Sequence, residues 1–365
     1  MNVARELINW YGINKRDLPW RNTRDPYRIW LSEIILQQTR VEQGKPYYER
    51  FLAAFPTIEQ LATAEEQAVL KLWQGLGYYS RARNLHAAAK QVVSDFNGRF
   101  PSSIDDILSL KGVGDYTAAA IGSFAFDIPS PVLDGNVFRF LSRYFGIATP
   151  IDSLAGKKEF MAIVLGLIDH RDPATFNQAI MEFGAMQCKP MSPNCPECPL
   201  AKECIAYRSD RVGVLPVKKN KTKVRDRYFN YLWIRSGDDC WVKQRQERDI
   251  WQNLFEFPLI ETEAPSSGKQ LSKSDALKKI CSADMGKPVP CGPELTHLLS
   301  HQKIHARFYE LCTDAQLDEA CYRKVNPKEL AELPVSRLMD LFIQGQMKKT
   351  LFLLTPQAQV KSRKP

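Results

Sequence analysis

Apolar side chains recur every three to four positions through most of residues 1–207, which is the spacing of amphipathic helices. The clearest stretches are 26–56, 58–77 and 81–98. Few stretches of this region alternate with a period of two, and stop signals such as glycine and proline repeatedly end the helical pattern. We therefore predict a mainly α-helical region over residues 1–207.

The pattern changes after this region. In residues 227–245, apolar positions alternate on both sides of a Ser-Gly-Asp-Asp sequence, which predicts a β-hairpin. Further regular segments are the strand-like stretch 303–312 and the helix-like stretches 276–286 and 334–349. This mixture predicts a second domain of α/β or α+β class over residues 228–355, followed by a tail at 356–365.

The chain of 365 residues carries 50 lysines and arginines against 41 aspartates and glutamates, a net charge of +9. A positive surplus of this size favours a polyanionic partner. Part of it lies in residues 208–227, where eight basic residues accompany two aspartates and apolar periodicity is weak. This segment is predicted to be a basic linker that is either solvated or lies along DNA.

The sequence has no apolar run long enough to span a bilayer, and it begins like an amphipathic helix rather than a secretory leader. We therefore expect a soluble intracellular protein with no membrane partner. In such a reducing compartment, crowded cysteines indicate metal or cluster ligation rather than disulfides.

Four of the nine cysteines crowd into the segment 188–204 with the spacing C-x6-C-x2-C-x5-C. They are Cys188, Cys195, Cys198 and Cys204. Zinc accepts four thiolates, and a C-x2-C pair is typical of zinc ribbons. The unequal spacing within one compact loop fits a [4Fe–4S] cluster at least as well. The spacing leaves both interpretations open.

A carboxylate lies on an apolar helix face at Glu33. Its neighbours at helical spacing are Ile29, Trp30, Leu36 and Gln37, of which three are apolar. Burying an unpaired carboxylate is costly, so the group responds with a raised pKa, as a general acid at neutral pH requires. The alternative is a structural Glu paired with a buried arginine or a cap.

Residues 105–124 read as helix, tight turn and helix, with the turn at Gly112-Val113-Gly114. Gly112 and Gly114 can take positive φ and turn successive backbone N–H groups outward. At a helix N-terminus, such amides can hold a phosphate without side-chain charge. An ordinary pair of packed antiparallel helices is the simpler interpretation of this segment alone.

A second carboxylate, Asp134, lies between an extended apolar segment and an amphipathic helix. It is predicted to be the N-cap of that helix. Two carboxylates are also what glycosidic-bond hydrolysis uses: one protonates the leaving group, and the other stabilises the oxocarbenium-like sugar.

The Gly-Val-Gly turn, the sequence Leu-Asp-Gly-Asn-Val at 133–137 and the cysteine loop together resemble the helix-hairpin-helix base-excision glycosylases that carry an iron–sulfur cluster. The stretches 31–39, 75–85 and 133–137 are similar to the adenine DNA glycosylases of the MutY type. The resemblance is dense over residues 10–207 and weaker beyond. It implies a [4Fe–4S] cluster on the four cysteines, with a structural and DNA-contacting role.

The resemblance also implies removal of adenine mispaired with 8-oxoguanine or guanine in double-stranded DNA, after the base is flipped from the stack. Glu33 would protonate adenine N7, Asp134 would stabilise the sugar cation, and Asn136 would orient that site. Trp20 and Arg21 would line the adenine pocket. We expect a monomer in the bacterial cytoplasm, associated with the nucleoid.

Further contacts with DNA are implied in the same way. Gln38 and Tyr78 would wedge into the duplex, while Thr39 and Leu76 would lie near the opposite 8-oxoguanine. The Gly112 and Gly114 amides would hold a backbone phosphate, with an alkali metal ion as a further ligand of the turn.

Tyr116 follows the glycine turn at the place where glycosylases that also cut the strand carry a lysine amine. A tyrosine cannot form the imine on which that lyase reaction depends. Hydrolysis alone, leaving an abasic site, is therefore expected.

The second domain resembles the family's nudix-like module, which reads the 8-oxoguanine strand, but it lacks the glutamate-rich box of pyrophosphohydrolases. Leu299 stands where the family commonly has phenylalanine, and Ser300 remains available for contact. Phe138 and Gln178 replace a lysine and a glutamate of some members. His297, His301 and His305 recur at four-residue spacing in a strand-like context, so we expect no zinc site there.

Two rival functions remain. An endonuclease III-like glycosylase/lyase is disfavoured by Tyr116 and by the long second domain. A non-catalytic DNA-binding module is disfavoured by Glu33, because binding alone does not need a carboxylate on an apolar helix face.

Overall fold

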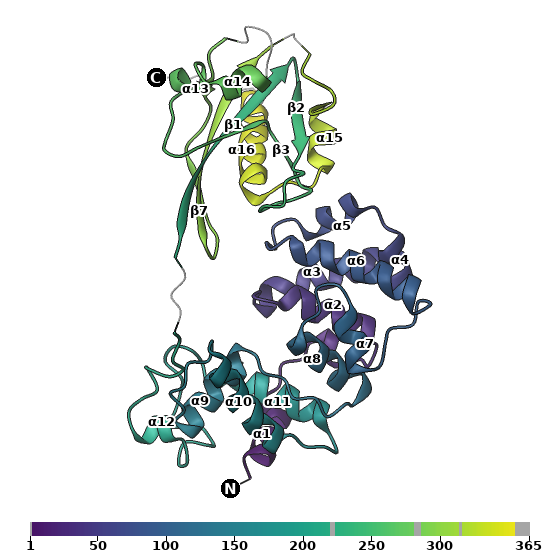
Figure 1. The fold of residues 1–365 in the computed structure, drawn as a ribbon, viewed down its shortest axis with the longest axis vertical. Coiled ribbons are helices and arrows are strands. Elements are labelled where there is room, and N and C mark those ends of the chain that lie inside the picture. The colour runs from purple at the N-terminus through teal and green to yellow at the C-terminus, as the bar shows by residue number, and fades with distance from the viewer. Residues whose placement is uncertain (1, 220–222, 281–285, 314–315, 355–365) are drawn as a thin grey trace, which may run out of the picture. The chain divides into compact units, whose positions relative to one another are not determined.

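The computed structural model describes residues 2–219, 223–280, 286–313 and 316–354 (Figure 1). The chain divides into two compact units. The first consists of Met1–Ala64 and Arg83–Lys221, and the second of Glu65–Ala82 and Thr222–Pro365. Residues 65–82, which lie within the N-terminal helical region of the sequence, therefore belong by their contacts to the second unit. No helix among the described residues is long and apolar enough to cross a bilayer.

The first unit is helical throughout, as predicted. Its helices are α1 (Val3–Asn14), η1 (Pro19–Arg21), α2 (Pro26–Leu36), α3 (Val41–Ala54), α4 (Ile58–Thr63), most of α6 (Ser80–Asp95), α7 (Ile104–Ser109), α8 (Asp115–Phe126), α9 (Gly135–Phe145), α10 (Leu154–Leu167), α11 (Pro173–Met186) and α12 (Ile205–Arg208).

Helix α2 is the centre of this unit. Asp25 caps it by accepting a hydrogen bond from the Tyr27 N–H, and Pro26 occupies the first helical position, where its missing N–H costs nothing. Eight of its eleven residues are buried. A helix buried on nearly every side must be surrounded by others, so the Glu33 side chain has little access to bulk water.

Helices α7 and α8 form the predicted helix–turn–helix. The turn is tight: Gly112 has φ +79°, and a Cβ there would lie 2.6 Å from the Asn84 Cβ, so only glycine fits. Gly114, which could also take positive φ, does not do so. Gly114 is the extended N-cap residue of α8, with φ −111° and ψ 177°, because a helix N-cap takes β-region angles.

Part of the predicted linker is packed against the helical unit, although most of its described residues are exposed. The Ile151 N–H donates to the Val217 carbonyl at 3.0 Å, and the Lys219 N–H donates to Asp152 Oδ1 at 2.8 Å. Leu215 is buried. These bonds tie residues 215–219 to the segment that precedes α10. The following strand begins at Arg225, inside the segment predicted as linker.

The second unit is built on a mixed sheet with short helices beside it. Its strands are β1 (Arg225–Ser236), β2 (Asp239–Gln244), β3 (Phe255–Glu256), β4 (Leu259–Thr262), β5 (Val289–Pro290), β6 (Leu295–Leu298), β7 (Gln302–Cys312) and β8 (Arg323–Val325). Its helices are α5 (Glu66–Trp73), α13 (Gly268–Leu271), α14 (Asp275–Ile280), α15 (Pro327–Glu332) and α16 (Arg337–Leu354).

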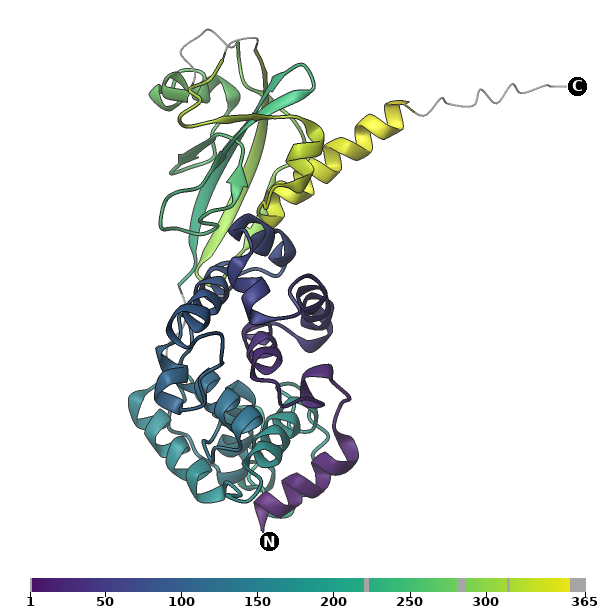
Figure 2. The same ribbon diagram turned by 90° about the vertical axis from the view of Figure 1, so that its right-hand side faces the viewer.

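The β1–β2 hairpin and the β7 strand confirm the predictions from alternation. Strand β7 pairs in parallel with β1 along eleven residue pairs, from Arg225↔Gln302 to Arg235↔Cys312. Helix α16 covers one face of the sheet, where Phe342 stacks on Phe308 at 4.0 Å, and its C-terminal turns extend beyond the sheet (Figure 2).

Residues 65–82 join this unit through specific hydrogen bonds. Lys71 Nζ donates to the Leu333 carbonyl at 3.1 Å, and Asn253 Nδ2 donates to Glu66 Oε1 at 2.6 Å. The Tyr79 hydroxyl donates to the Val335 carbonyl at 3.2 Å. These contacts explain why residues 65–82 group with the sheet.

Candidate active site

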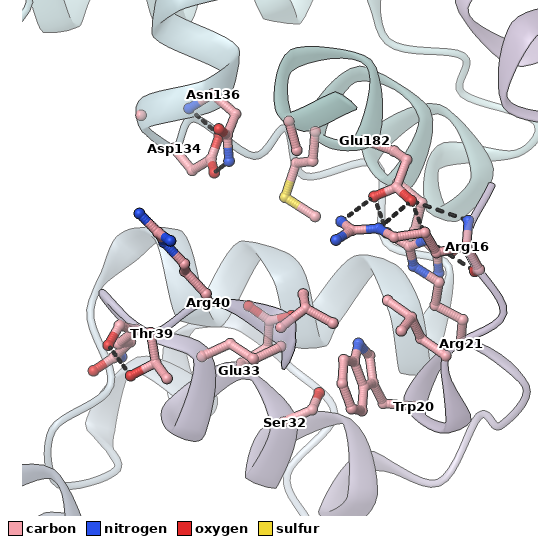
Figure 3. A pocket seen from close by; sticks show the side chains of 18 of the residues that line it. Arg16, Trp20, Arg21, Ser32, Glu33, Thr39, Arg40, Asp134, Asn136 and Glu182 are labelled. Carbon is pink, nitrogen blue, oxygen red and sulfur yellow. Dashed lines mark hydrogen bonds and ion pairs between the residues drawn. The ribbon is translucent and has the colours of Figure 1, made fainter. Parts of the chain in front are cut away.

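A cavity of about 890 Å³ in the helical unit is lined by residues of several elements. Its walls are η1, the C-terminal half of α2 with the loop after it, α8, the N-terminus of α9 and one face of α11. Figure 3 shows that Glu33 and Asp134 enter it from different walls. The volume lies within the usual range of ligand pockets, about 300–1,000 Å³.

Glu33 is buried in this cavity and bonded to Tyr116, whose hydroxyl donates to Glu33 Oε2 at 3.1 Å. Burial raises the pKa of Glu33 to about 7; the nearby Asp134 adds to the rise, while the Tyr116 bond and the Arg21 charge oppose it. Burial also raises the pKa of Tyr116 well above its ordinary value, so the phenol keeps its proton. Because Tyr116 occupies Oε2, Oε1 is the oxygen free to carry and release a proton.

Asp134 is the predicted N-cap of α9 and also faces the cavity. Its Oδ1 accepts from the backbone N–H groups of Asn136 and Val137 at 2.9 and 2.8 Å, and its Oδ2 accepts from Asn136 Nδ2 at 2.7 Å. Burial raises the pKa of Asp134, although these three donors oppose the rise. The carboxylate is thus held in one orientation by groups that favour its charged form.

Arg139 extends this chain of side chains toward the cysteine loop. Its Nη2 donates to Asn136 Oδ1 at 2.8 Å, and its Nε donates to the Cys188 carbonyl at 2.8 Å. Asn136 is therefore fixed from both sides, between Asp134 and Arg139. The first cysteine of the loop is linked to the Asp134 carboxylate through two side chains.

Trp20 and Arg21 lie on η1 at one end of the cavity. The Trp20 ring is buried and meets Tyr48 edge to face at 5.1 Å. Arg21 Nη1 and Nη2 donate to the two carboxylate oxygens of Glu182 at 2.9 and 2.7 Å. Together they provide an apolar wall and a fixed cation beside Glu33.

The polar loop after α2 forms another edge. Gln38 and Thr39 both line the cavity, and Gln38 has φ 55°. Positive φ is uncommon for a residue with a side chain and costs about 1–3 kcal/mol. A residue held this way beside a cavity is a candidate for contact with a ligand.

The remaining predicted contact residues lie outside this cavity. Leu76, Tyr78 and Ser300 belong to the second unit, where the Tyr78 and Ser300 hydroxyls are hydrogen-bonded to each other. Tyr78 is 46% exposed and has φ 49°, like Gln38. Gly112 and Gly114 precede α8, and Gly114 is its N-cap residue. A glycine has no side chain that could cap the N–H groups of the first turn of this helix.

Cys188, Cys195, Cys198 and Cys204 are free thiols that line one shared cavity. Burial raises the pKa of the Cys198 thiol to about 11, and the neighbouring cysteines add to the rise. Arg143 Nη1 lies 3.5 Å from Cys188 Sγ and 2.7 Å from the Lys189 carbonyl, so it joins the loop to α9. A half-buried cavity with four sulfurs and one cation suits an anionic thiolate-bound cluster.

The described residues include no group of three or more His, Cys, Asp or Glu arranged to hold a single metal ion. His297 and His305 lie on β6 and β7, with His301 in the turn between them. Side chains that alternate along strands do not share the face that four-residue spacing would give on a helix.

Sequence reasoning missed five charged residues that line the cavity: Arg16, Arg40, Glu42, Arg139 and Glu182. Glu182 could have been found by the argument that singled out Glu33. Its neighbours at helical spacing are Gln178, Ala179, Ala185 and Met186, again three apolar residues of four. No local signal indicates the role of Arg16, because its partner Glu182 lies 166 positions away. Arg139 bonds the nearby Asn136, but its other acceptors, the Gly184 and Cys188 carbonyls, are also distant in the sequence.

The chain matches two known families. Residues 31–164 match the family described as HhH-GPD superfamily base excision DNA repair protein, and residues 230–345 match the NUDIX domain family. The first match covers the segment with Glu33, the glycine turn and Asp134, and the second covers most of the sheet.

Similar proteins are known in bacteria and plants. An adenine DNA glycosylase of Buchnera aphidicola subsp. Schizaphis graminum is 37% identical over 257 residues, which cover 70% of this chain and 74% of the relative. An adenine DNA glycosylase of Arabidopsis thaliana is 36% identical over 401 residues, which cover 96% of this chain and 60% of the relative. The solved structure of a thermostable thymine-DNA glycosylase matches with a TM-score of 0.53 and 31% identity, over 56% of this chain and 95% of that one.

Proposed function

The chain belongs to the adenine DNA glycosylases, enzymes of base excision repair, and from this membership we propose how its cavity removes adenine and which base stands opposite. The observation that carries the proposal is the buried Glu33, whose pKa is raised to about 7, in a cavity shared with a second carboxylate.

Glu33 acts as the general acid on a flipped adenine. Its Oε1 proton passes to adenine N7, and the N9–C1′ bond then breaks with its electron pair leaving on the base. The positive charge that develops on the sugar is stabilised by the Asp134 carboxylate, which its three donors keep in place. Water adds at C1′, and its proton returns to a carboxylate of the cavity. The products are free adenine and an abasic site.

The reaction stops at hydrolysis. Strand cleavage by a glycosylase requires an amine that attacks C1′ to form an imine. The residues that line the cavity in the described part of the chain include arginines but no lysine. Tyr116 faces Glu33, and its phenol cannot form that imine.

The second unit supplies the preference for 8-oxoguanine or guanine opposite the adenine. Support comes from the grouping of Leu76, Tyr78 and Ser300 in one unit and from the bond between the Tyr78 and Ser300 hydroxyls. Tyr78 and Gln38, both exposed and both at positive φ, are the side chains that wedge into the duplex.

The cysteine loop holds one [4Fe–4S] cluster, for which the cavity of four thiols beside Arg143 is a fitting site. When bound, the cluster supplies a rigid, charged support for the loop rather than redox chemistry. The N–H groups of the first turn of α8 hold a DNA phosphate, and an alkali ion at the Gly112 turn would add positive charge for that contact.

The test is excision from duplexes in which adenine stands opposite 8-oxoguanine, guanine, cytosine or thymine, read as alkali-labile sites. We expect cleavage after alkali for the first two duplexes only, and no borohydride-trapped adduct. Glu33→Gln should still bind the mispair but lose about 10²–10⁴ in rate. Glu49→Gln, which changes an exposed carboxylate of α3, is the control and should keep the wild-type rate. Excision by Glu33→Gln within a few-fold of wild type would refute the role of Glu33.

A further inference from the structure

Glu182 is the most heavily bonded carboxylate of the cavity, although it is only 1% exposed. It accepts from the Arg16 N–H, Nε and Nη2 at 3.1, 2.8 and 2.7 Å. It also accepts from Arg21 Nη1 and Nη2 at 2.9 and 2.7 Å. Figure 3 shows the group at one end of the cavity, beside Trp20. One carboxylate thus holds two guanidinium groups in fixed geometry.

The ion group is charged at every pH at which the enzyme would act. Burial alone would raise the pKa of Glu182, but the hydrogen bonds from Arg16 and Arg21 outweigh it and lower the pKa to about 2. Two cations and one anion leave a single positive charge at this end of the cavity. Without the Glu182 charge, the same two arginines would contribute two positive charges.

That difference matters for Glu33, because Arg21 already opposes the rise in the pKa of Glu33. A more positive surrounding favours the ionised carboxylate and lowers its pKa. The other titratable or charged groups that face Glu33 or line its cavity are Arg16, Arg40, Glu42, Tyr116, Asp134, Arg139 and Glu182.

We propose that Glu182 is a positioning residue of the excision reaction. It holds Arg16 and Arg21 against α11 and neutralises part of their positive charge, which would otherwise favour ionisation of Glu33. The proposal rests on the role of Glu33 proposed above. The proposal also gives Arg16 and Arg21 a function. Because Glu182 holds their guanidinium groups in place, the N–H groups that do not bond Glu182 are fixed hydrogen-bond donors at the wall of the cavity that would receive the flipped base. A purine with acceptor nitrogens is the ligand that such donors suit.

The experiment measures single-turnover excision of adenine opposite 8-oxoguanine between pH 5.5 and 9, in wild type and Glu182→Gln. Glutamine keeps the size of the side chain but removes its charge. The wild-type rate should fall as pH rises through the pKa of Glu33, and in Glu182→Gln this fall should begin at lower pH. If the pH at which the rate falls moves down by one unit, the excision rate drops about tenfold at alkaline pH and changes little near pH 5.5.

Glu49→Gln is the matched control. Glu49 lies outside the cavity, 3.9 Å from Lys45 Nζ, and its side chain is 57% exposed, so water screens its charge. The pH profile of this variant should coincide with that of wild type. Cluster absorbance and binding of the mispaired duplex verify that each variant is folded.

A double variant separates charge from packing. Glu182→Gln combined with Arg21→Gln removes one negative and one positive charge. The pH at which the excision rate falls should therefore return toward its wild-type value, even if the maximal rate stays low. This variant also serves if Glu182→Gln alone does not fold. The proposal would be overturned if Glu182→Gln lowered the excision rate equally at all pH values. It would also be overturned if adding Arg21→Gln did not move the pH at which the rate falls back toward the wild-type value. If Glu33→Gln itself excises adenine normally, the role of Glu33 fails instead, and the two failures are distinct.

Discussion

Replacing Glu33 by glutamine should stabilise the protein at alkaline pH while it lowers the excision rate by about 10²–10⁴. The pKa of Glu33 is raised from its ordinary value of 4.5 to about 7, so the folded state binds its proton more tightly than the unfolded chain does. The shift corresponds to about 3 kcal/mol of unfolding free energy, at about 1.4 kcal/mol for each pKa unit. Because the side chain is buried, this penalty needs no discount for screening by solvent.

The sign follows from linkage between protonation and folding. Below pH 4.5 the carboxyl is protonated in both states, and its pKa shift has no effect on stability. As pH rises toward 7 the unfolded chain releases the proton while the folded protein retains it, so wild-type stability falls progressively. Above pH 7 the folded protein holds a buried carboxylate, and the full cost is present. Glutamine has no charge at any pH and can still accept from the Tyr116 hydroxyl.

The assay is urea unfolding, followed by far-ultraviolet circular dichroism from pH 4.5 to 8.5. The stability of Glu33→Gln minus that of wild type should be small at pH 4.5 and grow to about 3 kcal/mol at pH 8. The control Glu49→Gln removes a carboxylate that is 57% exposed and 3.9 Å from Lys45, and its difference should stay within about 1 kcal/mol throughout. A Glu33→Gln difference that does not change with pH would show that the carboxyl is not held protonated by burial.

Three further predictions follow from the turn and the cysteine loop. Tyr116→Lys should gain a borohydride-trapped adduct and some strand cleavage, and a folded, excising variant without trapping would show that this position does not face the sugar. Cys198→Ser should lose iron and the broad visible absorbance of thiolate-bound iron, whereas a wild-type protein with one zinc and no iron would contradict the cluster. Gly112→Ala should cost about 1–3 kcal/mol and weaken DNA binding, because residue 112 has φ +79° and no room for a Cβ, while Gly114→Ala, with nothing within 4 Å of its Cβ, should cost less. Equal effects of the two alanines, measured by unfolding and by duplex titration, would refute this account of the turn.

Local pattern was sufficient for much of the fold. The 3.6-residue spacing predicted the helices around Glu33, and alternation predicted the β1–β2 hairpin and β7, because both signals depend on neighbours along one element. The same logic placed Glu33 on a buried face and Asp134 at a helix N-cap, since three or four neighbouring residues decide each of these features.

Only the tertiary structure decided which distant residues meet. Glu182 follows Arg16 by 166 positions and Arg21 by 161, and no pattern along the chain pairs them. The parallel pairing of β1 with β7 and the grouping of residues 65–82 with the sheet are likewise long-range. The positive φ of Gln38 and the extended backbone of Gly114 also depend on how each helix end meets its surroundings. A sequence determines which side chains must be buried, but the charge balance around a buried acid depends on the packing of several helices, because Coulomb interactions act across space and not along the chain.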